Sequence, residues 1–100
     1  MRIIARKNLV AYVARHPSTR ALLTHWLDVA EKAEWASPQE VIVAFSKAKT
    51  VTADRVRFEM AGGEHRLIIA FHFRRGIAFF KLIGTHADYD RIDAANVDQF

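Results

Sequence analysis

Two short hairpins in series constrain the fold of this 100-residue chain more than any other feature. The stretch from Arg55 to Asp90 reads RVRFEMAGGEHRLIIAFHFRRGIAFFKLIGTHADYD. Gly62-Gly63 supplies the two positive-φ positions of a tight reversal, and Arg75-Gly76 stands between two apolar runs as a second reversal. The pattern therefore predicts three consecutive antiparallel strands.

A two-residue loop at each reversal fixes the register and separates the side chains onto two faces. The polar face then pairs Glu59 with Arg66, Arg57 with Ile68, Ala70 with Lys81, and Arg66 with Thr85. The apolar face pairs Phe58 with Leu67, Val56 with Ile69, Ile69 with Leu82, and Phe71 with Phe80. One register thus predicts a buried face and a basic face that gathers Arg57, Arg66 and Lys81.

Apolar spacing and capping residues predict helices before these strands. The expected elements are, in order, a short edge or inserted strand at 2–5, a helix capped by Asn8 and ending at His16-Pro17, a helix capped by Ser18, a short helix starting at Ser37-Pro38, a loop over 46–54, the three strands, and a last helix from about His86 to Ala94. Consecutive helices followed by consecutive strands favour an α+β fold, with the helices on the apolar face of the sheet. The length predicts a single domain over residues 1–100.

The composition excludes several classes of protein. The chain has no Cys, which rules out disulfides, Cys-ligated zinc and thiol catalysis. Its longest apolar runs are too short to cross a membrane, so no membrane association is expected. The start, MRIIARKNLVAYVARHP, lacks the continuous apolar segment and cleavage site of a secretion signal. The expected location is therefore the cytoplasm.

The net charge of +4 is unevenly placed along the chain. Residues 47–81 contain eight Lys and Arg against three Asp and Glu, whereas residues 82–100 contain one Arg against four Asp. A basic sheet face suits phosphates and indicates a possible nucleic-acid surface. Charge alone does not decide this, because many small basic proteins bind no nucleic acid.

Arg66 and Lys81 are the cations that the register places within the sheet. Arg66 has two interpretations: a cross-strand ion pair with Glu59, which contributes little at an exposed site, or a fixed guanidinium that binds a phosphate through two hydrogen bonds. Lys81 interrupts an otherwise apolar strand, IAFFKLIG, on the same face. A strand with a purely structural role does not need that lysine.

The turn after the last strand contains a second group of polar residues. Thr85 and Asp88 are explained as a helix cap. His86, Tyr89 and Asp90 are not, and their spacing of three and four places them on one side of the turn. His86 can exchange a proton near neutral pH, and Tyr89 can be a donor or an apolar plate. A metal bound by His86 and Asp90 lacks a third ligand.

The other histidines are interpreted as mainly structural. His16 precedes a proline at a helix end, His25 lies beside an apolar helical stripe, and His65 should point toward the core side of its strand. His72 falls on the basic face, where it is either a ligand contact or a solvated strand residue.

Five segments together resemble one family. MRIIARKNLVAYVARHP, WASPQEV, DRVRFEM, HRLIIAF and above all IGTHADYDRID closely resemble HigB-type toxins of bacterial toxin-antitoxin pairs, in the RelE-like superfamily. The resemblance runs from Met1 to about Asp93. The chain departs from the family where Gly63-Glu64-His65 replaces the usual Asn-x-Tyr, and where Asp88 replaces a frequent Glu.

The resemblance implies a fold and an activity. The fold would be RelE-like, an antiparallel-rich sheet with helices packed on one side. The activity would be that of a ribosome-dependent mRNA interferase, an endoribonuclease that cleaves mRNA at the decoding site and inhibits translation and growth. The implied partners are mRNA, the ribosome and a cognate helix-turn-helix antitoxin, HigA-like. Such toxins resemble metal-free nucleases, so no cofactor is expected.

RNA cleavage by its own 2′-OH needs phosphate binding and two proton transfers. We expect Arg66 and Lys81 to hold the scissile phosphate, His86 and Tyr89 to share the proton transfers, and Asp90 to orient the His. The expected RNA-binding residues are Lys47, Arg57, His72, Arg74 and Arg75. Two alternatives are a non-catalytic RNA- or protein-binding domain that uses the basic face, and a metal-dependent nuclease that uses His86 and Asp90.

Overall fold

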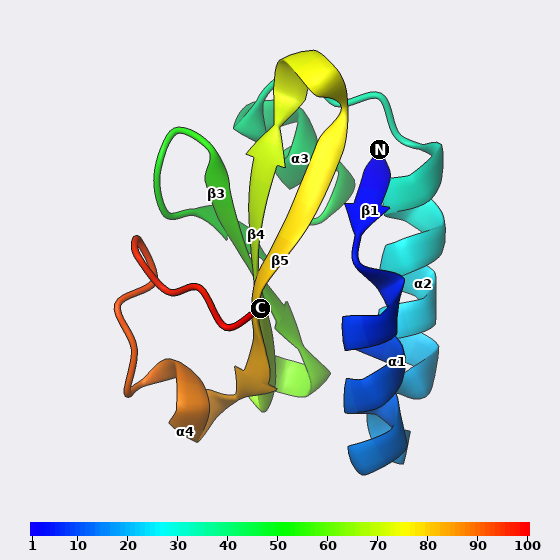
Figure 1. The fold of residues 1–100 in the computed structure, drawn as a ribbon, viewed down its shortest axis with the longest axis vertical. Coiled ribbons are helices and arrows are strands. Elements are labelled where there is room, and N and C mark those ends of the chain that lie inside the picture. Colours follow the sequence, from blue (N-terminus) through cyan, green and yellow to red (C-terminus); the bar gives the residue numbers. More distant parts are fainter.

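Three helices cover one face of a five-stranded sheet in the computed structural model, which describes residues 1–100 (Figure 1). The elements are β1 Arg2–Ile4, α1 Arg6–Arg15, α2 Arg20–Lys32, α3 Pro38–Ala44, β2 Ala48–Thr50, β3 Arg55–Met60, β4 His65–His72, β5 Ile77–Thr85 and α4 His86–Tyr89, with short 3-10 turns at Pro17–Thr19, Ala61–Gly63 and Phe73–Arg75. The expected α+β fold with N-terminal helices on one face is confirmed. None of the helices is both long enough and apolar enough to span a membrane.

The sheet contains one more strand than the sequence pattern predicts. Its strand order is β1-β5-β4-β3-β2, with β1 parallel to β5 and every other pair antiparallel. β1 is the edge strand expected at the N-terminus. The loop predicted over 46–54 is wrong in part, because Ala48–Thr50 pairs with β3 as the other edge strand. Three residues are too few to show an alternating pattern.

The first hairpin has the predicted register. Glu59 pairs with Arg66, Arg57 with Ile68, Phe58 with Leu67, and Val56 with Ile69. Gly62 and Gly63 both have positive φ, at 67° and 94°, as the tight reversal requires. The charged side chains of β3 and β4 therefore share one face of the sheet, as expected.

The register predicted for the second hairpin is wrong. Phe73–Arg75 forms a 3-10 turn closed by Gly76 at φ 66°, so the loop is longer than two residues. The observed pairs are Phe71 with Ala78, Ala70 with Phe79, Ile69 with Phe80, Ile68 with Leu82, Arg66 with Gly84, and His65 with Thr85. A β-bulge between Ile68 and Ile69 leaves Lys81 without a direct partner. The bulge also moves Leu82 out of the main core, while Ile83 enters it.

The core lies between the helices and the sheet, and Trp26 of α2 is at its centre. Trp26 is fully buried, and its ring centroid lies 5.5 Å from those of Phe58 and Phe80. The buried side of α2 consists of Leu23, Trp26, Leu27 and Ala30, whereas Leu22 is 41% exposed. Burial of these large side chains is the main force that holds the helices on the sheet.

The predicted helix ends are right in three places and wrong in three. The first helix ends at His16-Pro17 as expected, since α1 ends at Arg15 with His16 as its C-cap. Ser37 caps α3 and Thr85 caps α4 as expected. Asn8 lies inside α1, which starts at Arg6, and Ser18 lies in the 3-10 turn before α2. The last helix was expected to reach Ala94 but ends at Tyr89. Residues 90–100 instead run back along the sheet face that the helices leave uncovered (Figure 1).

A Tyr–His hydrogen bond joins α1 to the start of β4. The Tyr12 hydroxyl lies 2.6 Å from His65 Nδ1, and the Tyr12 ring stacks on that of His16 with centroids 4.4 Å apart. Burial, helped by the nearby His16, lowers the pKa of His65. The imidazole is therefore neutral near pH 7, and its Nδ1 shares one hydrogen bond with the Tyr12 hydroxyl. His65 points toward the helices, as expected, and both histidines serve the packing of α1.

This pair predicts a loss of stability in mild acid. Because the pKa of His65 is lower in the folded protein than in the unfolded chain, its contribution is complete above about pH 6.5. It is lost progressively as the pH falls from there toward the lowered pKa, since the unfolded state then binds more protons. The free energy of unfolding, measured with urea at pH 7.5 and at pH 5.5, should change less between the two pH values in His65→Gln than in the parent. His72 is exposed, so His72→Gln is the control and should show the same change in unfolding free energy with pH as the parent. If His65→Gln also shows the parent's change, His65 is not the cause of the lost stability.

Candidate active site

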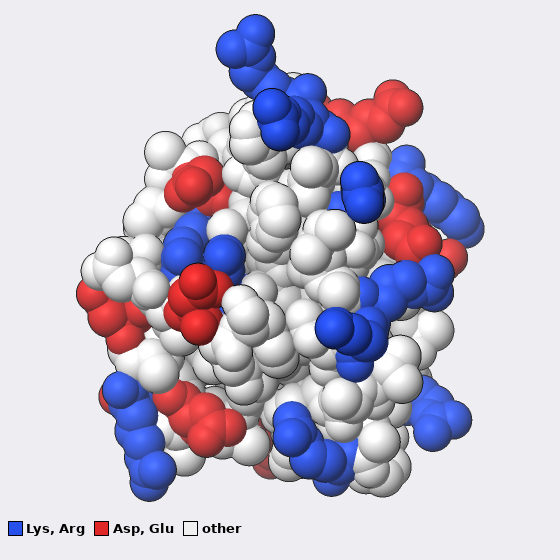
Figure 2. Space-filling view, viewed as in Figure 1, with Lys and Arg blue, Asp and Glu red and all other residues white.

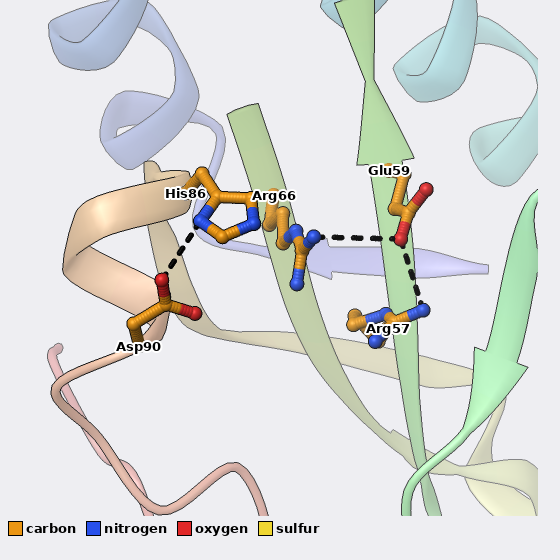
Figure 3. Close-up of polar contacts among 5 residues, drawn as sticks. All are labelled: Arg57, Glu59, Arg66, His86 and Asp90. Carbon is orange, nitrogen blue, oxygen red and sulfur yellow. Dashed lines mark hydrogen bonds and ion pairs between the residues drawn. The ribbon is translucent and has the colours of Figure 1, made fainter. Parts of the chain in front are cut away.

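Two arginines and a glutamate form an ionic group on the sheet face opposite the helices. Glu59 Oε1 lies 3.0 Å from Arg57 Nη2 and 3.6 Å from Arg66 Nη2 (Figure 3). The two arginine side chains are only 16% and 12% exposed. One carboxylate shared by two guanidinium groups leaves an excess positive charge in a partly buried setting, where it attracts an anion more strongly than at an exposed site.

The Tyr89 ring fixes the two guanidinium groups from the side of α4. The ring centroid lies 4.6 Å from Arg66 Cζ and 5.6 Å from Arg57 Cζ, within the range of cation–π attraction. The Nε atom of each arginine is buried without a hydrogen-bond partner. Arg66 is therefore held in place by a ring and by a loose ion pair while part of its donor capacity stays unused.

The capping of α4 places Tyr89 and His86. The Thr85 hydroxyl accepts from the Asp88 N–H at 3.2 Å, and Asp88 Oδ2 accepts from the Thr85 N–H at 2.9 Å. These hydrogen bonds lower the pKa of Asp88. Gly84 lies opposite Arg66 in the sheet, and its lack of a side chain lets this turn fold close to the strand. The capping explanation for Thr85 and Asp88 is confirmed.

Replacing Gly84 with alanine should weaken this turn. The added Cβ would lie 2.9 Å from Asp88 Cβ, closer than carbon atoms approach without a shift of α4. We expect a loss of about 1–3 kcal/mol in the free energy of unfolding, measured with urea. Asp88→Gly removes the clashing atoms, so Gly84→Ala should cost less in that background. An equal cost in both backgrounds would show that the clash is not the cause.

His86 and Asp90 form the pair that their spacing predicts. His86 Nδ1 lies 2.9 Å from Asp90 Oδ2, and both side chains are more than half exposed. In Figure 3 this pair lies on one side of Arg66, while Glu59 and Arg57 lie on the other. No group of three His, Asp or Glu side chains is placed to hold a metal ion. The imidazole is thus oriented by a carboxylate and open to solvent next to the arginines.

Lys81 shares the sheet face with Arg66 but makes its contact elsewhere. Its Nζ lies 3.1 Å from Asp98 Oδ1, in the C-terminal segment. In this structure Arg66 and Lys81 therefore contact different carboxylates, Glu59 and Asp98. The acidic segment, which the sequence separates from the strands, lies on the basic face.

The expected RNA-binding residues are spread over the surface. Arg57 belongs to the ionic group, whereas Lys47 is exposed in the turn before β2. Arg74 and Arg75 are exposed in the β4–β5 turn, and the Arg75 N–H donates to His72 Nδ1 at 3.3 Å. On the face in Figure 2, Lys and Arg form separate groups with Asp and Glu between them. Arg57, Arg66 and Lys81 therefore share the predicted sheet face, whereas Lys47, Arg74 and Arg75 lie in exposed turns.

The sequence reasoning understated two residues of this site. Glu59 was interpreted only as an exposed partner of Arg66, yet it also binds Arg57 and is mostly buried. Arg57 was assigned to the RNA backbone in general, but it lies under the same Tyr89 ring as Arg66. The alternation Arg57-x-Glu59 opposite Arg66 was a signal for a three-residue cluster.

Comparison with known proteins gives a family match over most of the chain. Residues 19–92 match the family model for the HigB toxin, described as the RelE-like toxic component of a toxin-antitoxin system. The chain belongs to the HigB toxin family. No curated protein matches it. The region matched to the HigB toxin contains the arginine cluster and the His86–Asp90 pair and ends before the segment that contacts Lys81.

Proposed function

We propose that this HigB-family toxin is a ribosome-dependent mRNA interferase that cleaves RNA without a metal ion. The observation that supports it best is Arg66, a nearly buried guanidinium stacked on Tyr89, which belongs to the same short helix as the solvent-open His86–Asp90 pair. A fixed guanidinium is suited to a phosphate, and an oriented imidazole is suited to proton transfer. Both groups lie at the end of the sheet where α4 begins.

In the proposed reaction the RNA supplies its own nucleophile. Its 2′-oxygen forms a bond to phosphorus while the bond from phosphorus to the 5′-oxygen breaks, which gives a 2′,3′-cyclic phosphate and a 5′-hydroxyl. Arg66 stabilises the charge on the phosphate, and Arg57 adds to the positive field. His86 and Tyr89 share the two proton transfers, one from the 2′-OH and one to the leaving oxygen.

Asp90 and Glu59 are positioning residues in this proposal. Because Asp90 contacts His86 Nδ1, Nε2 is the ring nitrogen left to exchange a proton with RNA. Glu59 holds Arg57 at 3.0 Å but Arg66 at only 3.6 Å. A phosphate can therefore replace Glu59 as the ionic partner of Arg66 while Glu59 remains paired with Arg57.

The proposed partners of the toxin are an antitoxin, mRNA and the ribosome. Membership in the family implies an antitoxin. We assign a helix-turn-helix protein of the HigA type to that role, and mRNA on the cytoplasmic ribosome as the substrate. A small helix-turn-helix reading frame beside this one would support the assignment. Its purified product should abolish cleavage when mixed with the toxin.

A translation extract separates this function from the alternatives. The purified toxin should cut mRNA at codon-positioned sites, read by primer extension, only when ribosomes are present. Salt-sensitive RNA binding with no cuts would instead support a non-catalytic RNA-binding domain. Toxin treated with a chelator and then desalted should cut as fast as untreated toxin, whereas lost activity restored by a metal would support a metal-dependent nuclease.

A further inference from the structure

The last eight residues bind to the sheet face rather than leaving it. Arg55 Nη1 donates to the carbonyls of Ala94 at 3.1 Å and Val97 at 2.7 Å, which fixes the start of the segment. Lys81 Nζ donates to Asp98 at 3.1 Å. Residues 93–100 follow the part of the chain that matches the family model. The docked segment thus lies outside the matched residues.

Gln99 attaches the segment at the β-bulge. Its N–H donates to the Lys81 carbonyl at 3.0 Å, and its side-chain oxygen accepts from the Ile83 N–H at 2.9 Å. Lys81 and Ile83 lie beyond Phe79, the last residue of β5 that pairs with β1, so their backbone groups on this edge are open to the segment. The two bonds hold Asp98, the preceding residue, over the Lys81 side chain.

We propose that residues 93–100 form an autoinhibitory strap that occupies the Lys81 phosphate position until RNA displaces it. The inference rests on the proposed function and adds Lys81 to it, as the ligand of a second phosphate of the RNA strand that Arg66 binds. A carboxylate on a lysine offers the same charge and acceptor oxygens as a phosphate. Lys81 is only 22% exposed in this state, so RNA reaches its ammonium group after Asp98 leaves.

The contact is weak enough to be reversed. The Asp98 side chain is 60% exposed, and ion pairs at such positions contribute little to stability. A strand of RNA presents several phosphates to the same face, so it can outcompete one carboxylate. The strap therefore lowers RNA affinity by a modest factor instead of blocking the toxin.

RNA binding measured without ribosomes tests the strap. Fluorescence anisotropy with a short fluorescein-labelled single-stranded RNA should give Asp98→Asn an affinity about two- to five-fold higher than the parent. Asp28→Asn is the matched control, because Asp28 also pairs with a lysine, Lys32, but on the outer surface of α2. It removes the same charge and should produce a smaller gain. In a Lys81→Ala background, Asp98→Asn should produce no gain beyond that of Asp28→Asn.

The outcomes separate the strap from the proposed function. Equal gains in Asp98→Asn and Asp28→Asn would overturn the strap, since only net charge would then matter. A gain that persists without Lys81 would overturn it as well. The assay requires no cleavage, so a toxin that never cuts mRNA but shows the Lys81-dependent gain retains the strap and loses only the nuclease function. Thermal melting of Asp98→Asn and of the parent checks that the variant is folded, so that a gain in RNA affinity does not come from unfolding.

Discussion

Replacing Arg66 with alanine is expected to lower ribosome-dependent mRNA cleavage by about 10²- to 10³-fold. The guanidinium is held between the Tyr89 ring and Glu59, so it meets the phosphate without losing further side-chain freedom. Its removal takes away the donor that stabilises charge on the phosphate in the transition state. Single-turnover cleavage of mRNA on programmed ribosomes measures the effect. Growth arrest on expression should be relieved in parallel.

Two further variants show whether geometry or charge matters at Arg66. Arg66→Lys keeps the charge but loses the planar two-bond geometry and the stacking, so it should recover only part of the rate. Arg20→Ala removes an exposed arginine of α2, far from the site, and should cut like the parent. Circular dichroism and thermal melting establish that Arg66→Ala is folded. If it cuts as fast as Arg20→Ala, Arg66 does not hold the scissile phosphate.

The first hairpin could be predicted and the second could not, for a physical reason. Gly62-Gly63 adopts positive φ, and its position between two alternating strands sets the register. Phe73 and Arg74 have strand-like neighbours, yet they enter a 3-10 turn whose end is fixed by a hydrogen bond from Arg75 to His72. The bulged Lys81 accepts a backbone hydrogen bond from Gln99, eighteen residues away in sequence, a contact that no local pattern shows.

In the candidate site, too, the contacts between residues near in sequence could be predicted and those between distant residues could not. The His86–Asp90 pair was predictable because both residues lie within one helical turn. The stack of Tyr89 on Arg66 and the pairing of Lys81 with Asp98 depend on how the chain leaves α4. A helix continuing to Ala94 would have directed the acidic segment away from the sheet. Its early end brings that segment back over the basic strands.

Replacing His86 with alanine is expected to lower cleavage by about 10²- to 10⁴-fold, the usual contribution of one general acid or base. The imidazole is more than half exposed and its ion pair is with Asp90, so its loss should leave the fold and the RNA affinity nearly unchanged. The defect should therefore lie in the chemical step rather than in binding. Single-turnover cleavage at saturating toxin, compared with RNA binding by anisotropy, separates the two.

Variants of the neighbouring residues assign the roles around His86. Asp90→Asn removes the carboxylate that orients the ring, so it should cost less than His86→Ala and have no further effect once His86 is absent. Tyr89→Phe keeps the ring stacked on Arg66 but removes the hydroxyl. Its loss of cleavage rate therefore measures what the hydroxyl contributes to proton transfer. His25→Ala, an exposed histidine on α2, is the matched control and should cut normally. If His86→Ala and Tyr89→Phe both cut as fast as the parent, neither residue transfers a proton and the catalytic site lies elsewhere.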